Sequence, residues 1–467
     1  MNRPQVPMLL PRSASGISLR SSKRRKPSCS VPITGDLPNS LLTASSNSPM
    51  EPYAMTGGTI LLTNLHPDEA LSLVIEAGTA LSRSLGTETV PLDRALGRVL
   101  AQDIHASIDH PPFAKAAMDG YAYVRGTEFD RYTVIDAVPA GKASSKKLAE
   151  GEAARIMTGA PLPEGATGVQ RIEWTEELGR DSEGRPLVRF RLREKIDNII
   201  ARGENLQQGA LLLTRRFLMP QDIGILAADG IAEVEVRRKL RVGVISTGDE
   251  IVPAGTALPP AAIYDSNGPQ LAAQAWAAGA EVMTFGIVQD SETALTEVLS
   301  RALSQCTMVI LSGGVSMGDY DLVPRVLQKL GVEPVFHSLK MRPGKPTFFG
   351  KTDKAAVFGL PGNPVSTFVN FEVLVKPFLH ACMGLDYTPL MLRVRLASPL
   401  VRKGSDRVEF LPGTLQLSPE GMTAEPLPYH GSSMITVLAH AQVLFRMEIG
   451  QERIEAGAYT DARLIRA

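Results

Sequence analysis

The stretch from Met308 to Gly331, MVILSGGVSMGDYDLVPRVLQKLG, decides the fold that we expect. It reads as a short buried strand, a glycine-rich loop and a helix. Such a unit places free backbone N–H groups and a helix N-terminus at the end of a strand, which suits anion binding. The loop also carries two carboxylates, Asp319 and Asp321. A loop of this kind predicts either a phosphorylated ligand with a metal ion or chemistry that needs both signs of charge.

Outward from this unit, short apolar runs alternate with helical periodicity from Leu240 onward. Strands are predicted over 242–245, 281–288, 308–311 and 355–360, and helices over 269–278, 293–304, 322–330 and from 365. This alternation predicts a parallel sheet with helices on both faces, a doubly wound α/β domain. Ligands of such open sheets bind outside the carboxyl ends of the strands.

The flanking regions have a different character. Residues 1–55 are rich in Ser, Pro and Arg and lack apolar periodicity, so we expect them to be disordered. A helix is predicted to begin at Pro67, because acids fill its first turn. Residues 105–236 contain short strand-like runs punctuated by Gly and Pro, and alternation of apolar and polar residues follows from about Pro389. Both regions are therefore expected to be mainly β.

Composition and charge exclude several functional classes. The chain has 467 residues, 44% of them hydrophobic, and equal numbers of basic and acidic residues, 49 of each. This balance gives no overall basic footprint for nucleic acid. No apolar run approaches the roughly 18 residues that span a membrane, so we expect neither a nucleic-acid nor a membrane partner. The three cysteines, Cys29, Cys306 and Cys382, are far apart, which fits a reducing, cytoplasmic location and predicts no disulfide framework or zinc site.

The N-terminal 50 residues are locally basic. They contain seven Lys or Arg and one acid, a local charge of +6, which leaves −6 for the rest of the chain. The SSKRRK run at 21–26 can be interpreted as a targeting or nucleic-acid segment. The composition favours an extension without a function of its own over that reading.

Three predicted strand exits carry unusual loops: Ser246–Glu250, the glycine loop after Met308–Leu311, and Gly359–Ser366. A single loop of this kind is as readily a tight strand–helix connection. Three at one sheet edge favour a ligand crevice. Familiar nucleotide motifs are absent, because Asp319 and Tyr320 follow where a Walker A loop needs Lys and Ser or Thr, and no G-x-G-x-x-G follows a strand.

The segment Lys340–Pro346, KMRPGKP, holds three cations in a small volume, because its prolines restrict the backbone. Arg342 can hold an oxyanion bidentately, and Lys340 and Lys345 add point charge. We favour this oxyanion role over a solvated cationic turn. Asp265 precedes a predicted helix, where it is either a cap or a ligand contact such as a metal ligand.

Two further short segments read locally as plain turns. Asp119-Gly120 is typical of a hairpin turn, and Thr158-Gly159-Ala160-Pro161 is also turn-like. Spacing alone assigns neither a function.

Seven segments together resemble the molybdopterin molybdenumtransferase family, the MoeA proteins and the E domain of gephyrin. They occur in the family's order and cover essentially residues 66–467: AAMDGYAY (116–123), IMTGAPLPEGA (156–166), ISTGDEIVPAG (245–255), IYDSNGPQLAA (263–273), LSGGVSMGDYD (311–321), MRPGKP (341–346) and GLPGNPVS (359–366).

The resemblance implies an α/β multidomain subunit in a homodimer. Its expected parts are a disordered extension (1–60), a linker domain I (66–104 and 202–237), an inserted β-rich domain II (105–201), a doubly wound molybdopterin-binding domain III (238–386) and a C-terminal β domain IV (389–467). The family inserts molybdate into adenylylated molybdopterin with Mg²⁺ and releases AMP. A molybdopterin adenylyltransferase and acceptor molybdoenzymes are the implied protein partners.

The resemblance also implies a role for individual residues, in a cleft shared with the β-rich domain of the other subunit. The catalytic set is Asp119, Asp321, Glu250, Lys340 and Arg342. The cofactor-binding set is Thr158, Gly313, Gly314, Ser316, Lys345, Pro361, Gly362 and Asn363, and the metal set is Asp249, Glu250 and Asp265.

The sequence departs from the family at five positions. They are Ser338 and Arg342, where the family usually has Lys at both, Asn205 where Asp is usual, Gly268 where Arg is common and Ala117 where Ser is common. These departures keep two alternatives open: a weakened paralogue that acts as a scaffold or cofactor carrier, and the molybdopterin adenylyltransferase step itself. The extra β domains argue against the second.

Overall fold

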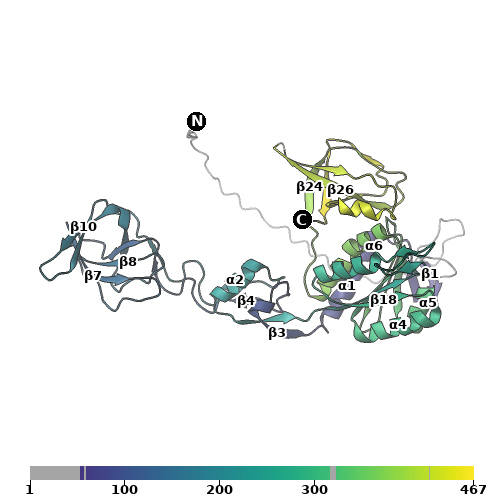
Figure 1. The fold of residues 1–467 in the computed structure, drawn as a ribbon, viewed down its shortest axis with the longest axis horizontal. Helices are drawn as coiled ribbons and strands as arrows, with labels where there is room; N and C mark the ends of the chain where they lie inside the picture. The colour runs from purple at the N-terminus through teal and green to yellow at the C-terminus, as the bar shows by residue number, and fades with distance from the viewer. Residues whose placement is uncertain (1–52, 57–58, 316–321, 420, 467) are drawn as a thin grey trace, which may run out of the picture. The chain divides into compact units, whose positions relative to one another are not determined.

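A computed structural model describes residues 53–466 except 57–58, 316–321 and 420 (Figure 1). The expected disordered extension, 1–60, lies almost entirely outside the described residues, and its described part, 53–56 and 59–60, lies in strands rather than in disordered chain. The predicted site residues Ser316 and Asp321 lie outside them as well, as does Asp319.

The largest sheet has eight strands in the order β1-β2-β20-β22-β23-β19-β15-β18. They are β1 (Tyr53–Thr56), β2 (Thr59–Leu62), β20 (Glu333–Ser338), β22 (Pro346–Lys351), β23 (Ala356–Leu360), β19 (Met308–Ser312), β15 (Arg241–Thr247) and β18 (Glu281–Val288). The four strands predicted from the sequence, β15, β18, β19 and β23, are confirmed and run parallel.

The sheet is mixed rather than wholly parallel, which corrects the expectation. Strand β22 pairs antiparallel with both β20 and β23. A short turn over 352–355 joins β22 to β23, so no crossover helix separates them. A prediction based on alternating strands and helices therefore missed β20 and β22.

Helices cover both faces of this sheet, as predicted. On one face lie α1 (Pro67–Ser82), α3 (Asn267–Ala277), α6 (Pro364–Asn370), the π-helical turn η3 (Phe371–Val375) and α7 (Lys376–Cys382), and on the other lie α4 (Glu292–Gln305) and α5 (Leu322–Lys329). Within β19, Ile310 packs towards the first group and Val309 towards the second. Because both faces are buried, the central strands read as continuous apolar runs.

The helix α1 begins where the acids predicted it. His66 is its N-cap, whose Nδ1 accepts from the N–H of Asp68, and Glu69 accepts from the N–H of His66. This reciprocal arrangement satisfies two of the N–H groups that a helix start leaves open.

The β-rich insertion contains a six-stranded sheet in the order β10-β11-β7-β8-β6-β9. Its strands are β6 (Gly120–Tyr123), β7 (Tyr132–Val138), β8 (Glu152–Ile156), β9 (Gly168–Arg171), β10 (Thr175–Arg180) and β11 (Pro186–Phe190), with η2 (Ile172–Trp174) between β9 and β10. The expected Asp119-Gly120 hairpin is wrong. The strand before it, β5 (Lys115–Ala116), pairs with β12 (Ile199–Ile200), whereas β6 pairs with β8 and β9.

Shorter elements on either side of this insertion share one small core. They are β3 (Thr87–Pro91) paired with β14 (Glu233–Arg237), β4 (Ile104–His105) paired with β13 (Leu211–Leu213), the turn η1 (Leu92–Arg94) and helix α2 (Pro220–Ala228). Segments far apart in the sequence thus form one unit before the chain enters β15.

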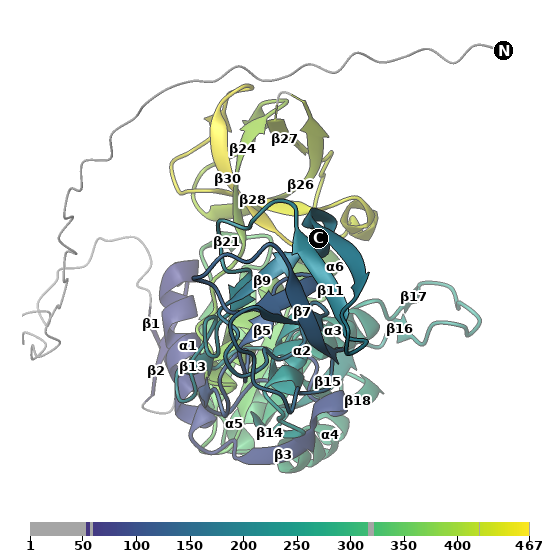
Figure 2. The same ribbon diagram turned by 90° about the vertical axis from the view of Figure 1, so that its left-hand side faces the viewer.

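The C-terminal region is β, as predicted, and one of its strands comes from outside it. The sheet order is β21-β26-β27-β24-β30-β28, with a further β26–β28 pairing (Figure 2). Its strands are β21 (Met341–Arg342), β24 (Met391–Leu396), β26 (Val408–Ser418), β27 (Gly421–Pro426), β28 (Val443–Met447) and β30 (Tyr459–Leu464), accompanied by β25 (Leu400–Val401), β29 (Arg453–Ile454) and η4 (Ile435–Ala439). A two-stranded ribbon of β16 (Ile251–Val252) and β17 (Ile263–Tyr264) projects after β15 (Figure 2).

No helix in the described part of the chain is both long and apolar enough to cross a bilayer.

Candidate functional site

The ends of three parallel strands bring the predicted loops together. Ser246 of β15 is in register with Ser312 of β19, which is in register with Leu360 of β23. The loops that follow these residues therefore leave the sheet side by side, at the edge where open α/β sheets bind ligands.

These loops line a crevice with a volume of about 640 Å³. Seven of the predicted site residues line it: Glu250, Asp265, Gly313, Gly314, Pro361, Gly362 and Asn363. The three-loop interpretation of the sequence is therefore supported by the geometry.

The glycine loop needs its two described glycines. Gly313 has φ +93° and Gly314 has φ +62°, the left-handed region that favours glycine. A Cβ at Gly313 would lie 2.5 Å from the backbone oxygen of Thr247, and one at Gly314 would lie 2.9 Å from a methyl group of Val323. The backbone can thus approach both the neighbouring loop and a ligand closely, as anion-binding loops require.

Asn267 ties the loops to one another, a role that the sequence reading missed. Its Nδ2 donates to Ser312 Oγ at 2.7 Å and to the carbonyl oxygen of Gly362 at 2.6 Å. Its Oδ1 is buried and has no hydrogen-bond partner among the described residues. A polar ligand in the crevice would supply the missing donor. The signal was its place in the Asp-Ser-Asn run at the start of α3.

Asp265 is held firmly by its neighbours. Its Oδ1 accepts from the N–H of Gly268 at 2.9 Å, and its Oδ2 accepts from Ser246 Oγ at 2.8 Å. The capping role weighed from the sequence is therefore present, since Gly268 lies in the first turn of α3. Asp265 also lines the crevice, so a ligand contact remains compatible with the cap.

Of the other acids near the strand exits, some line the crevice and Asp249 does not. Glu250 lines the crevice, whereas Asp249 accepts from the N–H of Asp290 at 3.2 Å. Asp290 also lines the crevice and was missed. It lies just beyond Gln289, after the end of β18 at Val288, so it stands at a fourth strand exit, and that position was the available signal.

The predicted metal set is not assembled as a compact cluster within the described residues. No group of three or more His, Cys, Asp or Glu among them is placed to hold a metal ion. Mg²⁺ keeps several waters and needs only one or two carboxylates when phosphate oxygens complete its shell. Glu250, Asp265 and Asp290 fit that requirement as donor types.

The three cations of the basic turn do not line the crevice, in contrast to the expectation. Lys340, Arg342 and Lys345 are exposed, and none is among the crevice-lining residues that the structure describes. Arg342 pairs instead with Glu409 of β26, with 3.4 Å between Nε and Oε1. Pro346, directly after Lys345, does line the crevice.

Glu409 is a buried acid between two arginines. Its side chain is 5% exposed, and Arg402 Nη1 lies 3.8 Å from its Oε2, whereas Arg342 approaches its Oε1. Burial raises the pKa of Glu409, while Arg342 and Arg402 oppose that rise. The basic turn is thus joined to the C-terminal sheet by charge as well as by strand pairing.

Asp119 and Thr158, which looked like unrelated turns, contact one another. Asp119 Oδ1 accepts from the N–H of Thr158 at 2.6 Å and from its Oγ1 at 2.8 Å. These backbone and side-chain hydrogen bonds lower the pKa of Asp119, and both residues are exposed. Gly120 keeps the strand pair close, because a Cβ there would lie 1.8 Å from the backbone oxygen of Gln170.

Two of the departures from the family pattern have a local structural reason. Ser338 is 1% exposed and its Oγ accepts from the N–H of Asn64 at 2.8 Å. A Cβ at Gly268 would lie 2.5 Å from Asp265 Oδ2, so glycine lets that carboxylate occupy its position. Asn205 is exposed, and its N–H donates to the carbonyl oxygen of His110 at 2.9 Å.

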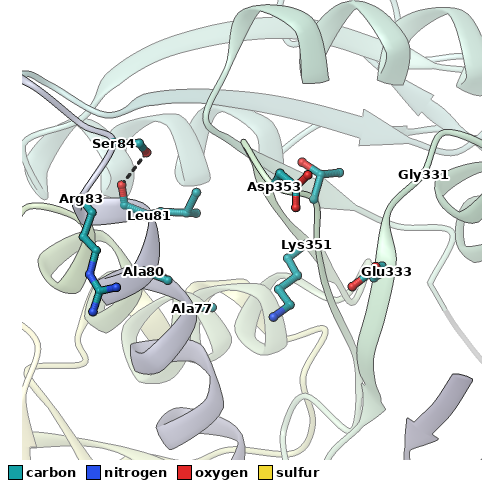
Figure 3. Close-up of a pocket in the computed structure, with 10 residues that line it drawn as sticks. Ala77, Ala80, Leu81, Arg83, Ser84, Gly331, Glu333, Lys351 and Asp353 are labelled. Carbon is teal, nitrogen blue, oxygen red and sulfur yellow. Dashed lines mark hydrogen bonds between the residues drawn. The ribbon is translucent and has the colours of Figure 1, made fainter.

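A second cavity, of about 610 Å³, lies elsewhere (Figure 3). The last turns of α1 line it together with the ends of β20 and β22. None of the predicted site residues lines it. Size alone therefore does not identify the functional site.

A doubly wound domain with a glycine–acid crevice at its strand exits, preceded and followed in the chain by β-rich regions, defines a multidomain α/β protein with a crevice that suits a phosphorylated ligand. Three family profiles match the chain in order: the MoeA N-terminal region (domain I and II) over residues 65–230, a probable molybdopterin-binding domain over 243–381, and the MoeA C-terminal region (domain IV) over 393–463.

Individual relatives agree with these profiles. The chain is 34% identical over 385 residues to a Staphylococcus aureus protein named molybdopterin molybdenumtransferase, covering 80% of this chain and 90% of the relative. A Staphylococcus epidermidis protein of the same name is 32% identical over 384 residues, with 80% and 90% covered. The crystal structure of the molybdopterin biosynthesis MoeA protein from Pyrococcus horikoshii has a TM-score of 0.71 and 32% identity, with 87% of this chain and 100% of that chain covered.

The chain belongs to the MoeA family.

Proposed function

We propose that the chain is a molybdopterin molybdenumtransferase, which inserts molybdate into adenylylated molybdopterin and releases AMP. The observation that carries this proposal is the crevice where three parallel strands end, with glycine backbone on one side and carboxylates on another. The names of the S. aureus and S. epidermidis relatives support it.

The glycine loop would hold the phosphate end of the substrate. Backbone N–H groups at Gly313 and Gly314 can donate to phosphate oxygens without a cost for ordering side chains. Ser316 and Asp321, predicted from the sequence alone, would extend this loop. Pro361, Gly362 and Asn363 form the opposite wall of the crevice.

The carboxylates would hold a divalent cation. Mg²⁺ bound by Glu250 and Asp265, with Asp249 and Asp290 beside them, would neutralise phosphate charge at the bond to be broken. The carboxylate of Asp265 is held by bonds to Ser246 and to the N–H of Gly268, and that of Asp249 by the N–H of Asp290. Positioning and charge stabilisation are then the main contributions of the protein.

The cations of the basic turn would hold molybdate. Lys340 and Lys345 are exposed and carry their ammonium groups on flexible four-carbon stems, and Arg342 offers a forked donor. The ion pair with Glu409 restrains Arg342. Molybdate would therefore compete with Glu409 for this guanidinium.

Asp119 and Thr158 would complete the site in a homodimer. Their hydrogen-bonded pair is exposed and sits on the β-rich region. We assign it to the crevice of a second copy of the chain, in the cytoplasm. A molybdopterin adenylyltransferase would supply the substrate, and acceptor molybdoenzymes would take the product.

The test is an AMP-release assay with the full-length protein. Purified protein, adenylylated molybdopterin and Mg²⁺ are mixed with and without molybdate, and AMP is measured by chromatography. We expect AMP release that depends on molybdate. Folded protein that releases no AMP with molybdate would contradict the proposal. AMP incorporation from ATP into unmodified molybdopterin would favour the adenylyltransferase alternative.

A further inference from the structure

Three arginines surround a cavity that is separate from the crevice. Arg83, Arg215 and Arg237 line a space of about 400 Å³. No residue is shared between the linings of this cavity and of the crevice. We refer to the three residues as the arginine cluster.

The cluster is assembled by three separate parts of the fold. Arg83 is the C-cap of α1, Arg215 follows β13, and Arg237 ends β14. The turn at Gly384, after α7, lies beside two of the three arginine side chains. The position of a Cβ on Gly384 is 3.6 Å from Arg237 Nη2, 3.7 Å from Arg215 Nη1 and 3.4 Å from Ser82 Oγ. Two guanidinium groups and a hydroxyl thus converge on one point.

The cluster is not neutralised by ion pairs within the described residues. Arginines elsewhere in the chain, such as Arg98 and Arg446, are paired with carboxylates. By contrast, none of the three clustered guanidinium groups forms an ion pair with a described carboxylate. The Nε of Arg237 is also buried without an acceptor in the same part of the chain. A buried donor left without an acceptor is costly, so an acceptor from a ligand would be stabilising.

The neighbouring 610 Å³ cavity, in contrast, is lined by equal numbers of cationic and anionic side chains. That cavity is also lined by Arg83, with Lys351 as its second cation (Figure 3). Two carboxylates, Glu333 and Asp353, line the same cavity, so its charges cancel. The cavity of the arginine cluster has only the exposed Asp386 against three arginines. The net positive charge of its lining therefore favours the binding of an anion.

We propose that the arginine cluster is a second oxyanion site, which binds a phosphate group carried by a free phosphate ion or a small phosphomonoester. Guanidinium groups match phosphate oxygens in fork geometry and remain charged at all physiological pH values. The hydroxyl of Ser82 offers a further donor. Part of the wall is apolar, through Ile75, Pro377 and Leu385, which leaves room for a small organic group on the phosphate.

The test is calorimetric titration of the full-length protein with sodium phosphate in chloride buffer. We expect the Arg215→Gln/Arg237→Gln variant to lose one phosphate site or to bind phosphate at that site at least tenfold more weakly. Arg216→Gln is the matched control, because Arg216 adjoins Arg215 in the chain but does not line the cavity. This control should titrate like the wild type, including any binding at the crevice.

A single substitution distinguishes loss of phosphate binding from loss of the fold. Arg215 is exposed, so Arg215→Gln alone should keep the fold, which its circular dichroism and thermal unfolding would verify. It should still weaken phosphate binding several-fold. A wild type that binds no phosphate, or folded cluster variants that bind it as the wild type does, would overturn the proposal.

A parallel titration with glycerol phosphate separates the two sources of the phosphate group. Tighter binding than inorganic phosphate, lost in the same variants, assigns the site to a phosphomonoester. Equal or weaker binding assigns it to the free ion. Binding of either probe that does not depend on the arginines contradicts the site.

Discussion

The crevice and the basic turn were both predicted to hold anions, but their residues have different surroundings in the structure. The crevice collects loops from three parallel strands, and seven predicted residues line it. The basic turn, Lys340–Pro346, instead contributes β21 to the C-terminal sheet, where Arg342 pairs with Glu409.

The two regions differ in what determines which side chains come together. Where a parallel strand ends is fixed by the sheet, so side chains at its exits meet regardless of their identity. The partner of a cation in a turn is fixed by whichever acid lies across from it. That acid, Glu409, is distant in sequence, and no local pattern indicates it.

The strongest test of the crevice is Glu250→Gln. The exposed side chain lines the crevice, so the substitution removes one charge without disturbing the core. We expect kcat/KM for molybdate-dependent AMP release to fall about 100-fold, the scale of losing one preorganised electrostatic contact. The control is Glu333→Gln, an exposed carboxylate of the other cavity. Turnover within threefold of the wild type would remove Glu250 from the site.

The next test concerns the exposed pair on the β-rich region. Asp119→Asn keeps an oxygen acceptor for Thr158 but removes the charge. We expect turnover to fall about 30-fold, an electrostatic effect somewhat below that of the crevice acid. Thr158→Val, which removes only the Oγ1 donor, should cost less. If both variants turned over normally while folded, the pair would have a structural role only.

The Ser338 position separates an altered site from a weakened one. Lysine would lose the bond to Asn64 and would place an ammonium group where the side chain is 1% exposed. We expect Ser338→Lys to lower the free energy of unfolding by about 2 kcal/mol, and Ser338→Ala by about 1 kcal/mol. Urea unfolding measures both. A Lys variant of unchanged stability with sharply raised turnover would support the weakened-paralogue alternative instead.

The smallest expected effect concerns the basic turn itself. A double-mutant cycle of Arg342→Gln and Glu409→Gln should give a coupling energy of about 1 kcal/mol in unfolding, because Arg342 is half exposed and its pair with Glu409 is partly screened. A rise in the KM for molybdate in Arg342→Gln alone would show that the guanidinium also contacts substrate. No coupling would mean that strand pairing, not charge, holds the turn.

Much of the doubly wound domain could be predicted from local pattern. The strand over 281–288 was predicted with the bounds that the structure gives it. The central strands β19 and β23 are buried on both faces and therefore read as continuous apolar runs. The antiparallel strands β20 and β22 could not be found in this way. A short turn over 352–355, not a helix, joins β22 to β23, and β22 starts at Pro346, which masks a strand pattern.

The site was predictable to the extent that it depends on strand exits. The loop glycines and Glu250 followed from that rule, and Asp290 would have followed had it been applied to every strand. Asn267 acts through bonds to two distant loops, so only the assembled structure reveals it. The contact of Asp119 with Thr158 likewise depends on pairing between β6 and β8.

The pairing of β21 with β26 limits how freely the C-terminal region can be treated as a module. Met341 and Arg342 cover Val408 and Glu409 at the start of β26, and Val408 is fully buried. A fragment beginning near Pro389 would lack this cover and would present an open strand edge beside an apolar side chain. Such edges pair with other chains. The region would therefore be prone to self-association when produced alone, and gene fusions that exchange it would need to bring the Lys340–Pro346 segment as well.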